Sequence, residues 1–182
     1  MLVITNWRDS RHPETGGAEV VCHQLAERFA AAGHDVVLLC AAVDGAPREE
    51  TRDGYRIVRG GGRFGVYAHA LAWLARHRRR VEAVVDSQNG IPFFSPLVLP
   101  RSTPVLMLLH HVHQDQFAKY FPAPVAALGR FLESTVSRVV YGRRGVVTVS
   151  PSTRTDARRR LGLRGDIWVT PPGWSVTEAV RT

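Results

Sequence analysis

The chain has 182 residues, 45% of them hydrophobic and 22% charged, with a formal net charge of +8. This length and composition are typical of one globular domain that buries a core of its own. The two cysteines, Cys22 and Cys40, both stand at apolar positions, and the sequence shows neither a disulfide framework nor a zinc-binding spacing.

The positive charge comes from 23 arginines and a single lysine, Lys119. A basic surface favours polyanionic partners such as phosphate-bearing substrates, anionic membrane or nucleic acid. No helix-turn-helix, zinc-finger or RNA-binding signature is present, so we expect no nucleic acid. The N-terminus leads straight into an apolar run, without the segments of a secretion signal or a membrane span. The expected location is therefore the cytoplasm.

The first forty residues predict a strand, a glycine-containing loop, a helix and a second strand. Residues 2–5 form a short apolar strand, and the helix after Gly16 and Gly17 has one apolar stripe: Ala18, Val21, Cys22, Leu25, Ala26 and Phe29. Gly33 ends this helix, and residues 35–40 read as the next buried strand. Free N–H groups and the helix dipole at Gly16-Gly17 suit an anion, although the two glycines could equally serve only a tight turn.

The rest of the chain repeats this alternation of strands and helices. Residues 43–54 are expected to be a polar loop, and further strands are predicted at residues 55–58, 81–85, 105–109, 146–149 and 166–169. Helices are predicted over about residues 66–79, over 125–141, and from Ser150 as N-cap to Gly162. The helix over 125–141 is expected to turn one apolar stripe inward: Val125, Leu128, Leu132, Val136, Val139 and Val140. With no hairpin signal, the pattern predicts an α/β fold with a Rossmann-like, doubly wound parallel sheet of about seven strands.

Polar clusters follow several of these strands. In a parallel sheet, ligands bind beyond the carboxyl ends of the strands. That edge is formed by the loop to Gly16-Gly17, by residues 86–90 and 110–115, and by Ser150. The loop over residues 8–14, with Arg11 among its charges, faces the same edge and suits either a substrate contact or a solvated surface.

A second interpretation uses the glycines after the third predicted strand. Gly60, Gly62 and Gly65 match the dinucleotide pattern G-x-G-x-x-G, and Asp86 follows at the distance of a ribose-binding acid. The pattern lies in the third strand's loop rather than the first, so a flexible glycine loop competes with an NAD(P) site.

Histidines and arginines raise two further alternatives. His110, His111 and His113 could hold a metal, but spacing places no third ligand, and a role in hydrogen bonding or in acid–base chemistry needs fewer assumptions. The run Arg76–Arg80 reads either as a solvated helix end or as a contact with anionic lipid headgroups.

Several motifs, in order, resemble the N-terminal domain of GT-B glycosyltransferases of family 4, also called glycosyl transferase group 1. The resemblance rests on five segments and covers nearly the whole chain: Pro13-x-x-Gly16-Gly17-Ala18-Glu19, Gly33-His34-Asp35-Val36, residues 86–92, residues 104–111 and residues 147–153. Pro171-Pro172-Gly173 resembles the family's segment before the hinge, which usually reads Pro-Asn-Gly. Pro172 and Trp174 depart from the family's usual residues.

The resemblance implies a retaining transferase that moves a sugar from a nucleoside-diphosphate sugar to a sugar or lipid-linked acceptor. Gly16 and Gly17 would approach the donor's diphosphate, and His110 would lie near the transferred sugar as the catalytic residue. The acceptor side of the cleft would be lined by Arg11, Glu19, Gln88, Asn89, His111, Ser150 and Thr153. Enzymes of this type need no metal, so no cofactor is expected beyond the nucleotide-sugar co-substrate.

The resemblance also sets expectations for the domain organisation. Residues 1–174 would form the acceptor-side Rossmann-like domain, and residues 175–182 would begin the hinge or an added tail. The C-terminal domain, which would bind most of the nucleotide sugar, is absent, so we expect the isolated domain to fold without turning over. A stand-alone binding domain without catalysis is the remaining alternative.

Overall fold

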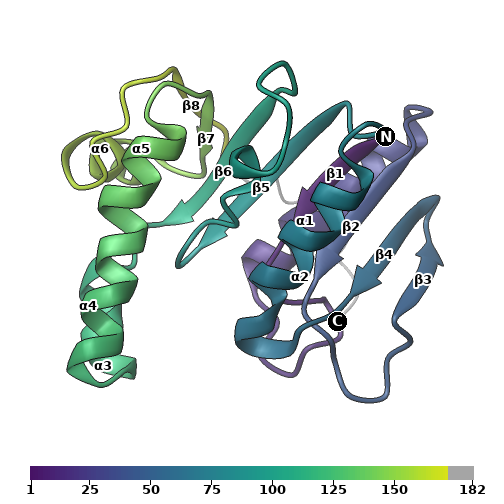
Figure 1. The fold of residues 1–182 in the computed structure, drawn as a ribbon, viewed down its shortest axis with the longest axis horizontal. Coiled ribbons are helices and arrows are strands. Elements are labelled where there is room, and N and C mark those ends of the chain that lie inside the picture. The colour runs from purple at the N-terminus through teal and green to yellow at the C-terminus, as the bar shows by residue number, and fades with distance from the viewer. Residues whose placement is uncertain (172–182) are drawn as a thin grey trace, which may run out of the picture.

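The computed structural model describes residues 1–171, and its eight strands form a single sheet (Figure 1). The spatial order is β3-β4-β2-β1-β5-β6-β7-β8. The strands are β1 (Leu2–Thr5), β2 (Val36–Cys40), β3 (Glu49–Arg52), β4 (Tyr55–Arg59), β5 (Ala83–Asn89), β6 (Val105–His111), β7 (Val146–Thr148) and β8 (Ile167–Val169). Every neighbouring pair is parallel except β3 and β4. The predicted doubly wound α/β fold is confirmed, whereas the boundary predicted at residue 174 lies outside the described residues.

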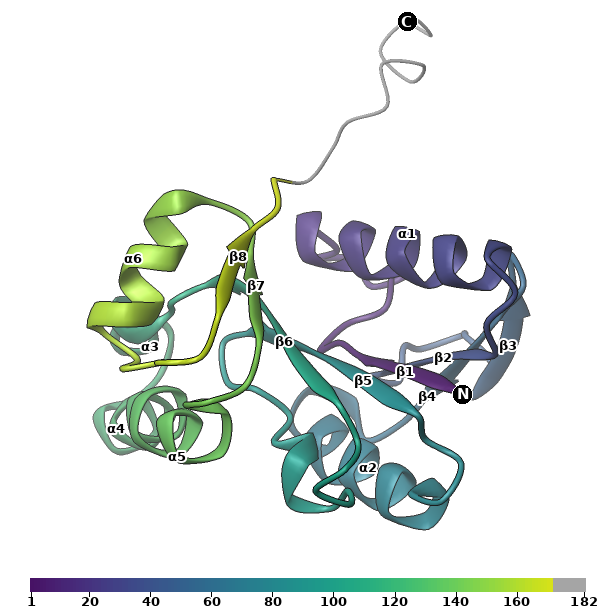
Figure 2. The same cartoon turned by 90° about the horizontal axis from the view of Figure 1, so that it is seen from above.

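Helices cover both faces of the sheet (Figure 2). They are α1 (Gly17–Ala31), α2 (Gly62–His77), α3 (Gln114–Tyr120), α4 (Ala123–Phe131), α5 (Ser137–Tyr141) and α6 (Pro151–Arg159), with a short 3-10 helix η1 (Ser95–Leu97) and a π-helical turn η2 (Leu132–Val136) between α4 and α5. Successive strand residues alternate between two cores, as the pleat of a strand requires. One core joins α1 to the sheet through Ile4, Cys22, Ala26, Leu38 and Ile57, and the other joins α2 and α5 to it through Val3, Val37, Leu74 and Tyr141.

The polar loop predicted over residues 43–54 is partly wrong, because its second half forms strand β3. This strand pairs with β4 in an antiparallel hairpin whose two-residue turn is Asp53-Gly54. Both turn residues have positive φ, 49° and 82°, as a type I′ turn requires. Asp-Gly is the sequence signal of such a turn, so the hairpin could have been recognised from the sequence.

The helix predicted over residues 125–141 exists, but half of its predicted inward stripe faces outward. Val125, Leu128 and Val139 are 47%, 56% and 79% exposed. The face that packs inward carries small and polar residues instead: Ala126, Gly129, Glu133, Ser137 and Tyr141. The π-helical turn η2 adds a residue to this helix and shifts its register, which a search for a 3.6-residue period does not detect.

Candidate active site

The candidate site lies where the sheet changes direction. Strand β1 is paired to β2 on one side and to β5 on the other. The chain leaves β1 through α1 to reach β2, and it later crosses through α2 to β5. The carboxyl ends of β1 and β5 therefore form a topological switch point, the place where open α/β sheets bind ligands.

A buried chain of hydrogen bonds crosses this switch point. The hydroxyl of Ser87, on β5, donates to Oδ1 of Asn6 at 3.2 Å, directly after β1. The hydroxyl oxygen of Ser87 also lies 3.1 Å from Nε2 of His110, at the end of β6. Because the one hydroxyl hydrogen of Ser87 is used toward Asn6, Nε2 of His110 must carry a proton and donate to Ser87. His110 is thereby held in one tautomer, with Nδ1 left as an acceptor.

The environment also determines the charge of His110. Burial lowers its pKa to about 4, with further lowering by the nearby imidazoles of His111 and His113. The side chain is only 4% exposed. His110 is therefore a neutral imidazole at pH 7, suited to hydrogen bonding rather than to carrying a charge.

Gly16 and Gly17 begin helix α1 at the same edge of the sheet. The backbone N–H of Gly16 donates to Oε2 of Glu19 at 2.8 Å, so Glu19 caps the helix from within. A methyl group added to Gly17 would meet no heavy atom within 4 Å. The first turn of α1 thus presents its backbone N–H groups beside open space, as an anion site requires.

Glu19 is placed differently from the other predicted acceptor residues. Its side chain is 1% exposed, and among residues 1–171 its second oxygen, Oε1, has no hydrogen-bond partner. Its observed contact is with the glycine loop. A contact between Glu19 and an acceptor therefore stays a prediction.

Buried charges hold the loop between β1 and α1 in place. Asp9 accepts a hydrogen bond from Nε of Arg59, at the end of β4, and both side chains are at most 1% exposed. Arg59 also donates to Glu50 of β3 at 2.7 Å and to the carbonyl of Pro47 at 2.8 Å. Burial alone would raise the pKa of Asp9, but hydrogen bonds from His23 and Arg59 outweigh it and hold that pKa well below its ordinary value.

The predicted site residue Arg11 belongs to the rim of this network. Its guanidinium lies 2.5 Å from Oε1 of Glu50, and its side chain is 45% exposed. Arg11 therefore links the loop to the β3–β4 hairpin and remains open to solvent at the carboxyl edge. A substrate contact through Arg11 stays a prediction.

A second buried carboxyl group lies beside the end of β5. Glu133 belongs to η2 and is fully buried, and its Oε1 accepts from the backbone N–H of His113 at 2.6 Å. Burial raises the pKa of Glu133 to about 7, against the lowering effects of the His113 N–H and of Arg160 and Gln88. Within residues 1–171, its Oε2 has no partner, and neither does Oε1 of Gln88. A protonated Glu133 could donate a hydrogen bond from Oε2 to Oε1 of Gln88, which would give both atoms a partner.

The remaining predicted site residues also gather at this edge. Ser150 caps α6, because its Oγ accepts from the backbone N–H of Thr153 at 3.1 Å. The hydroxyl of Thr153 reaches the carbonyl of His110 at 3.5 Å, which ties α6 to β6. Asn89 pairs in register with His111, the exposed last residue of β6. The structure therefore brings these predicted residues together, without testing their roles.

The structure gives no support to the alternative of a dinucleotide site at Gly60–Gly65. Asp86 is fully buried and accepts hydrogen bonds from the Phe93 N–H, from the N–H and hydroxyl of Ser95 and from the Tyr141 hydroxyl. A carboxylate used in this way does not reach a ribose. The glycines serve a tight turn instead, since a methyl group on Gly61, where φ is +74°, would lie 2.2 Å from the backbone oxygen of Gly65.

The metal interpretation gains no support from the histidines. The rings of His111 and His113 meet edge to face with centroids 6.2 Å apart, and Nδ1 of His113 lies 3.1 Å from the carbonyl of His111. Within the part of the chain that the structure describes, no group of three His, Cys, Asp or Glu side chains could hold a metal ion. That the reaction needs no metal stays a prediction.

Some residues of this site were not predicted from the sequence. Asn6 and Ser87 complete the chain to His110, and Glu133 lies under His113. A polar residue immediately after a buried strand is a signal that could have pointed to Asn6. No such signal singles out Glu133, because it stands on the small and polar face of its helix and not on the apolar stripe.

A parallel sheet covered by helices on both faces, with a glycine loop and a buried histidine at its switch point, defines a Rossmann-like domain with a ligand site at its carboxyl edge. The chain belongs to glycosyltransferase family 4, since the model of that family, described as Glycosyltransferase Family 4, matches residues 15–178. No curated protein matches the chain in sequence.

Solved structures show the same fold. Sucrose-phosphate synthase from Thermosynechococcus elongatus aligns with a TM-score of 0.72 at 17% identity, over 97% of this chain and 49% of that one. A shorter chain under the same name aligns with a TM-score of 0.61 at 15% identity, over 98% of this chain and 92% of that one. The chain thus spans about half the length of the longer synthase chain, and the comparison establishes a GT-B Rossmann-like domain.

Proposed function

We propose that this chain is the acceptor-side domain of a retaining glycosyltransferase that uses a nucleoside-diphosphate sugar. The supporting observation is the first turn of α1, where Gly17 borders open space at the same carboxyl edge of the sheet that carries His110. In the proposal, a second domain brings the donor's diphosphate against this turn. This chain alone would then fold without catalysing transfer.

The chemistry proposed for the first turn of α1 is stabilisation of the leaving group. As the bond between sugar and diphosphate breaks, negative charge grows on the phosphate oxygens. N–H groups that are already fixed in position stabilise this charge without reorganising. The buried pair of Asp9 and Arg59 holds the loop that leads into the turn, so the N–H groups keep their direction.

Neutral His110 is proposed to position the transferred sugar. Its Nε2 is engaged by Ser87 and its carbonyl oxygen by Thr153, so Nδ1 remains for the substrate. A neutral imidazole can accept a hydrogen bond from a sugar hydroxyl without adding charge to the site. The acceptor, a sugar or a lipid-linked sugar, would approach from Asn89, His111 and the Ser150–Thr153 cap.

A cytoplasmic location also belongs to the proposal. Among the described residues, none of the helices combines the length and the apolar character needed to cross a bilayer. The predicted lipid contact through Arg76–Arg80 is kept as one candidate. These arginines follow α2 at the edge where the strands begin, beside Met1, Asp35 and Glu82.

A single methyl group at Gly17 tests the proposed diphosphate contact. Gly17→Ala introduces no clash within the domain and removes a residue of low helix propensity, so its unfolding midpoint should not fall. In the full chain that the gene encodes, however, the methyl group would project into the space proposed for the diphosphate. We expect kcat/KM to fall about 10- to 100-fold, measured as nucleoside-diphosphate release from a panel of UDP-, GDP- and ADP-sugars.

The matched control is Gly65→Ala, since a methyl group there also meets nothing within 4 Å but lies in the first turn of α2 rather than that of α1. Gly65→Ala should retain wild-type turnover. Equal turnover by Gly17→Ala and the wild type would contradict the proposed contact.

A further inference from the structure

An apolar surface lies exposed at the corner formed by α3 and α4. Every residue of α4 that is exposed is apolar: Ala123, Pro124, Val125, Ala127, Leu128 and Phe131. Tyr120, the last residue of α3, is 73% exposed, and Phe64, in the first turn of α2, is 65% exposed. We call Phe64, Tyr120, Val125, Leu128 and Phe131 the corner surface.

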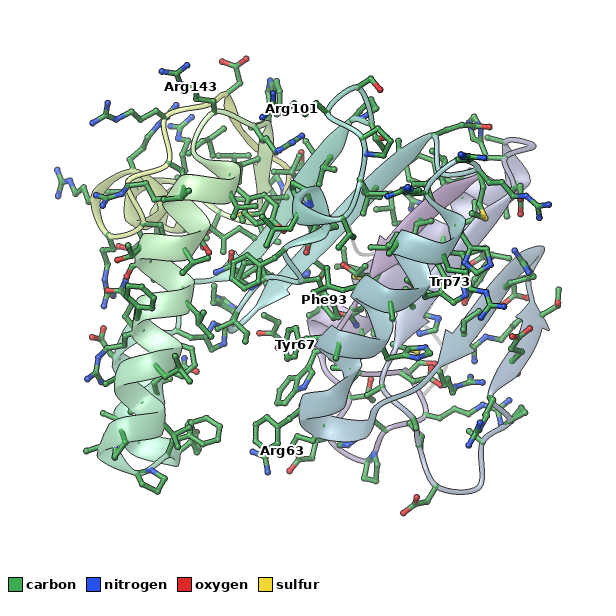
Figure 3. The ribbon with its side chains drawn as sticks, viewed as in Figure 1. Arg63, Tyr67, Trp73, Phe93, Arg101 and Arg143 are labelled. Atoms are coloured by element: carbon green, nitrogen blue, oxygen red, sulfur yellow. The ribbon has the colours of Figure 1, made fainter. Side chains whose placement is uncertain are left out.

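The two parts of the corner surface are joined by aromatic contacts. Phe121, between α3 and α4, packs against Phe64 with ring centroids 6.4 Å apart and against Phe117 at the same distance. The guanidinium of Arg63 lies over both Phe64 and Phe121, at 5.4 and 5.8 Å from the ring centroids. Figure 3 shows Arg63 at the end of α2 that faces α3 and α4. The surface is therefore a built feature and not a set of isolated residues.

The packing of α4 explains why its apolar stripe is outside. Gly129 faces inward, and a methyl group there would lie 2.7 Å from the ring of Phe117. The buried face continues through Glu133 and Ser137, which are held by hydrogen bonds to His113 and to the carbonyl of Leu132. Small and hydrogen-bonded residues thus occupy the inner face, and Val125, Leu128 and Phe131 remain for a partner outside the domain.

The charges around the corner surface identify the kind of partner. From residue 114 to residue 155, the chain carries six basic residues and two acidic ones: Glu133, which is fully buried, and Asp115, in the first turn of α3, which is exposed and paired with Arg160 at 2.9 Å. Arg63, Lys119 and Arg130 come from the same elements as the corner surface. Exposed Phe, Leu and Tyr side chains with an excess of cations around them are the pattern of a surface that inserts into an anionic bilayer.

We propose that the corner surface inserts into the headgroup region of an anionic lipid bilayer. Because α3 follows β6 directly, insertion would bring the carboxyl edge of the sheet, with His110 and the Ser150–Thr153 cap, close to the membrane. A second copy of the chain is a poorer partner, since both copies carry a net charge of +8. The basic run Arg76–Arg80 lies at the opposite edge, among the starts of the strands, and has no exposed large apolar neighbour among residues 65–96.

Vesicle flotation with the full chain tests the proposal. The probes are phosphatidylcholine vesicles with and without about 30% phosphatidylglycerol. We expect binding only with the anionic lipid and a loss of about tenfold or more in the triple variant Phe64→Ser, Leu128→Ser, Phe131→Ser. The matched control exchanges three apolar residues that are equally exposed elsewhere, Leu97→Ser, Val139→Ser and Trp168→Ser, and should bind like the wild type.

A second measurement reports insertion directly and does not depend on the triple variant's folding. Leu128→Cys can be labelled with an environment-sensitive fluorophore, because the native Cys22 and Cys40 are buried. We expect a blue shift on adding anionic vesicles, and none for a label at Val139→Cys.

Four results would overturn the proposal. One is binding of the triple variant equal to that of the wild type, and another is a labelled Leu128→Cys without a shift. The third is a wild-type dimer that the triple variant dissociates, which would assign the surface to a second copy. The fourth is a loss of vesicle binding in a variant that combines Arg76→Ser, Arg78→Ser and Arg79→Ser, while the corner-surface variant still binds. That result would assign the membrane contact to the edge where the strands begin.

Discussion

Replacing Asp9 with alanine is expected to lower the free energy of unfolding by about 3–5 kcal/mol. The carboxylate of Asp9 and the guanidinium of Arg59 are both at most 1% exposed, so the substitution leaves a buried cation without its main partner. Glu50 and the carbonyl of Pro47 remain on the other nitrogens of Arg59, but Nε loses its partner. The loop that leads into Gly16 would lose its anchor to β4.

Urea unfolding of the chain measures this effect. The control is Glu14→Ala in the same loop, which breaks the pair between Arg8 and Glu14, a residue with a 72% exposed side chain. An exposed pair of this kind contributes at most about 1 kcal/mol. If Asp9→Ala cost no more than Glu14→Ala, the buried pair would not be what holds the loop.

Glu133→Gln is expected to stabilise the protein by about 3 kcal/mol at pH 8 and by almost nothing at pH 4.5. The pKa of Glu133 is raised from its ordinary value near 4.5 to about 7, chiefly by burial. A raised pKa means that the folded state holds the proton more tightly than the unfolded state. Its contribution is therefore complete below pH 4.5 and is lost as the pH rises to 7.

The glutamine side chain keeps the groups that a protonated Glu133 offers. Its carbonyl accepts from the His113 N–H, and its amide donates toward Oε1 of Gln88. The measurement is the difference in unfolding free energy between Glu133→Gln and the wild type at both pH values. Glu14→Gln, an exposed control, should show the same small difference at both. A pH-independent difference for Glu133→Gln would show that Glu133 is ionised in the fold at neutral pH.

The alternation of apolar strands and amphipathic helices was sufficient to predict the parallel sheet. Burial on both faces makes the strands 36–40 and 105–109 almost wholly apolar, and that signal is local. The hairpin at Asp53-Gly54 was missed although its turn signal is also local.

The orientation of the helix from Ala123 to Tyr141 could not be predicted from its sequence in isolation. Its apolar stripe suggested an inner face, but Gly129 permits the close approach of Phe117, and Glu133 finds a buried N–H at His113. These partners lie on other elements, and the π-helical turn changes the register between them. Apolar periodicity identifies the face of a helix whose burial is favourable. Which face the domain itself buries depends on the residues that the helix packs against.

The sequence predicted the location of the candidate site more fully than the chemical state of its residues. Strand-end positions identified Gly16, Gly17, Gln88, His110 and Ser150, because the carboxyl edge of a parallel sheet follows from strand order. Two partners determine the protonation state of His110: Ser87 on β5 and Asn6 directly after β1. Their strands are distant in sequence and become neighbours only in the folded sheet. A tautomer and a lowered pKa depend on such contacts, so they were not accessible from spacing.

The central claim is that His110 positions the transferred sugar at this edge, and its most direct test is turnover by His110→Ala in the full chain. With the donor panel used for Gly17→Ala, we expect kcat/KM to fall about 100-fold or more while the circular dichroism spectrum stays that of the wild type. Ser87→Ala, which frees the tautomer of His110, should give a smaller loss in kcat/KM. Unchanged kcat/KM in His110→Ala would contradict the assignment of the active site.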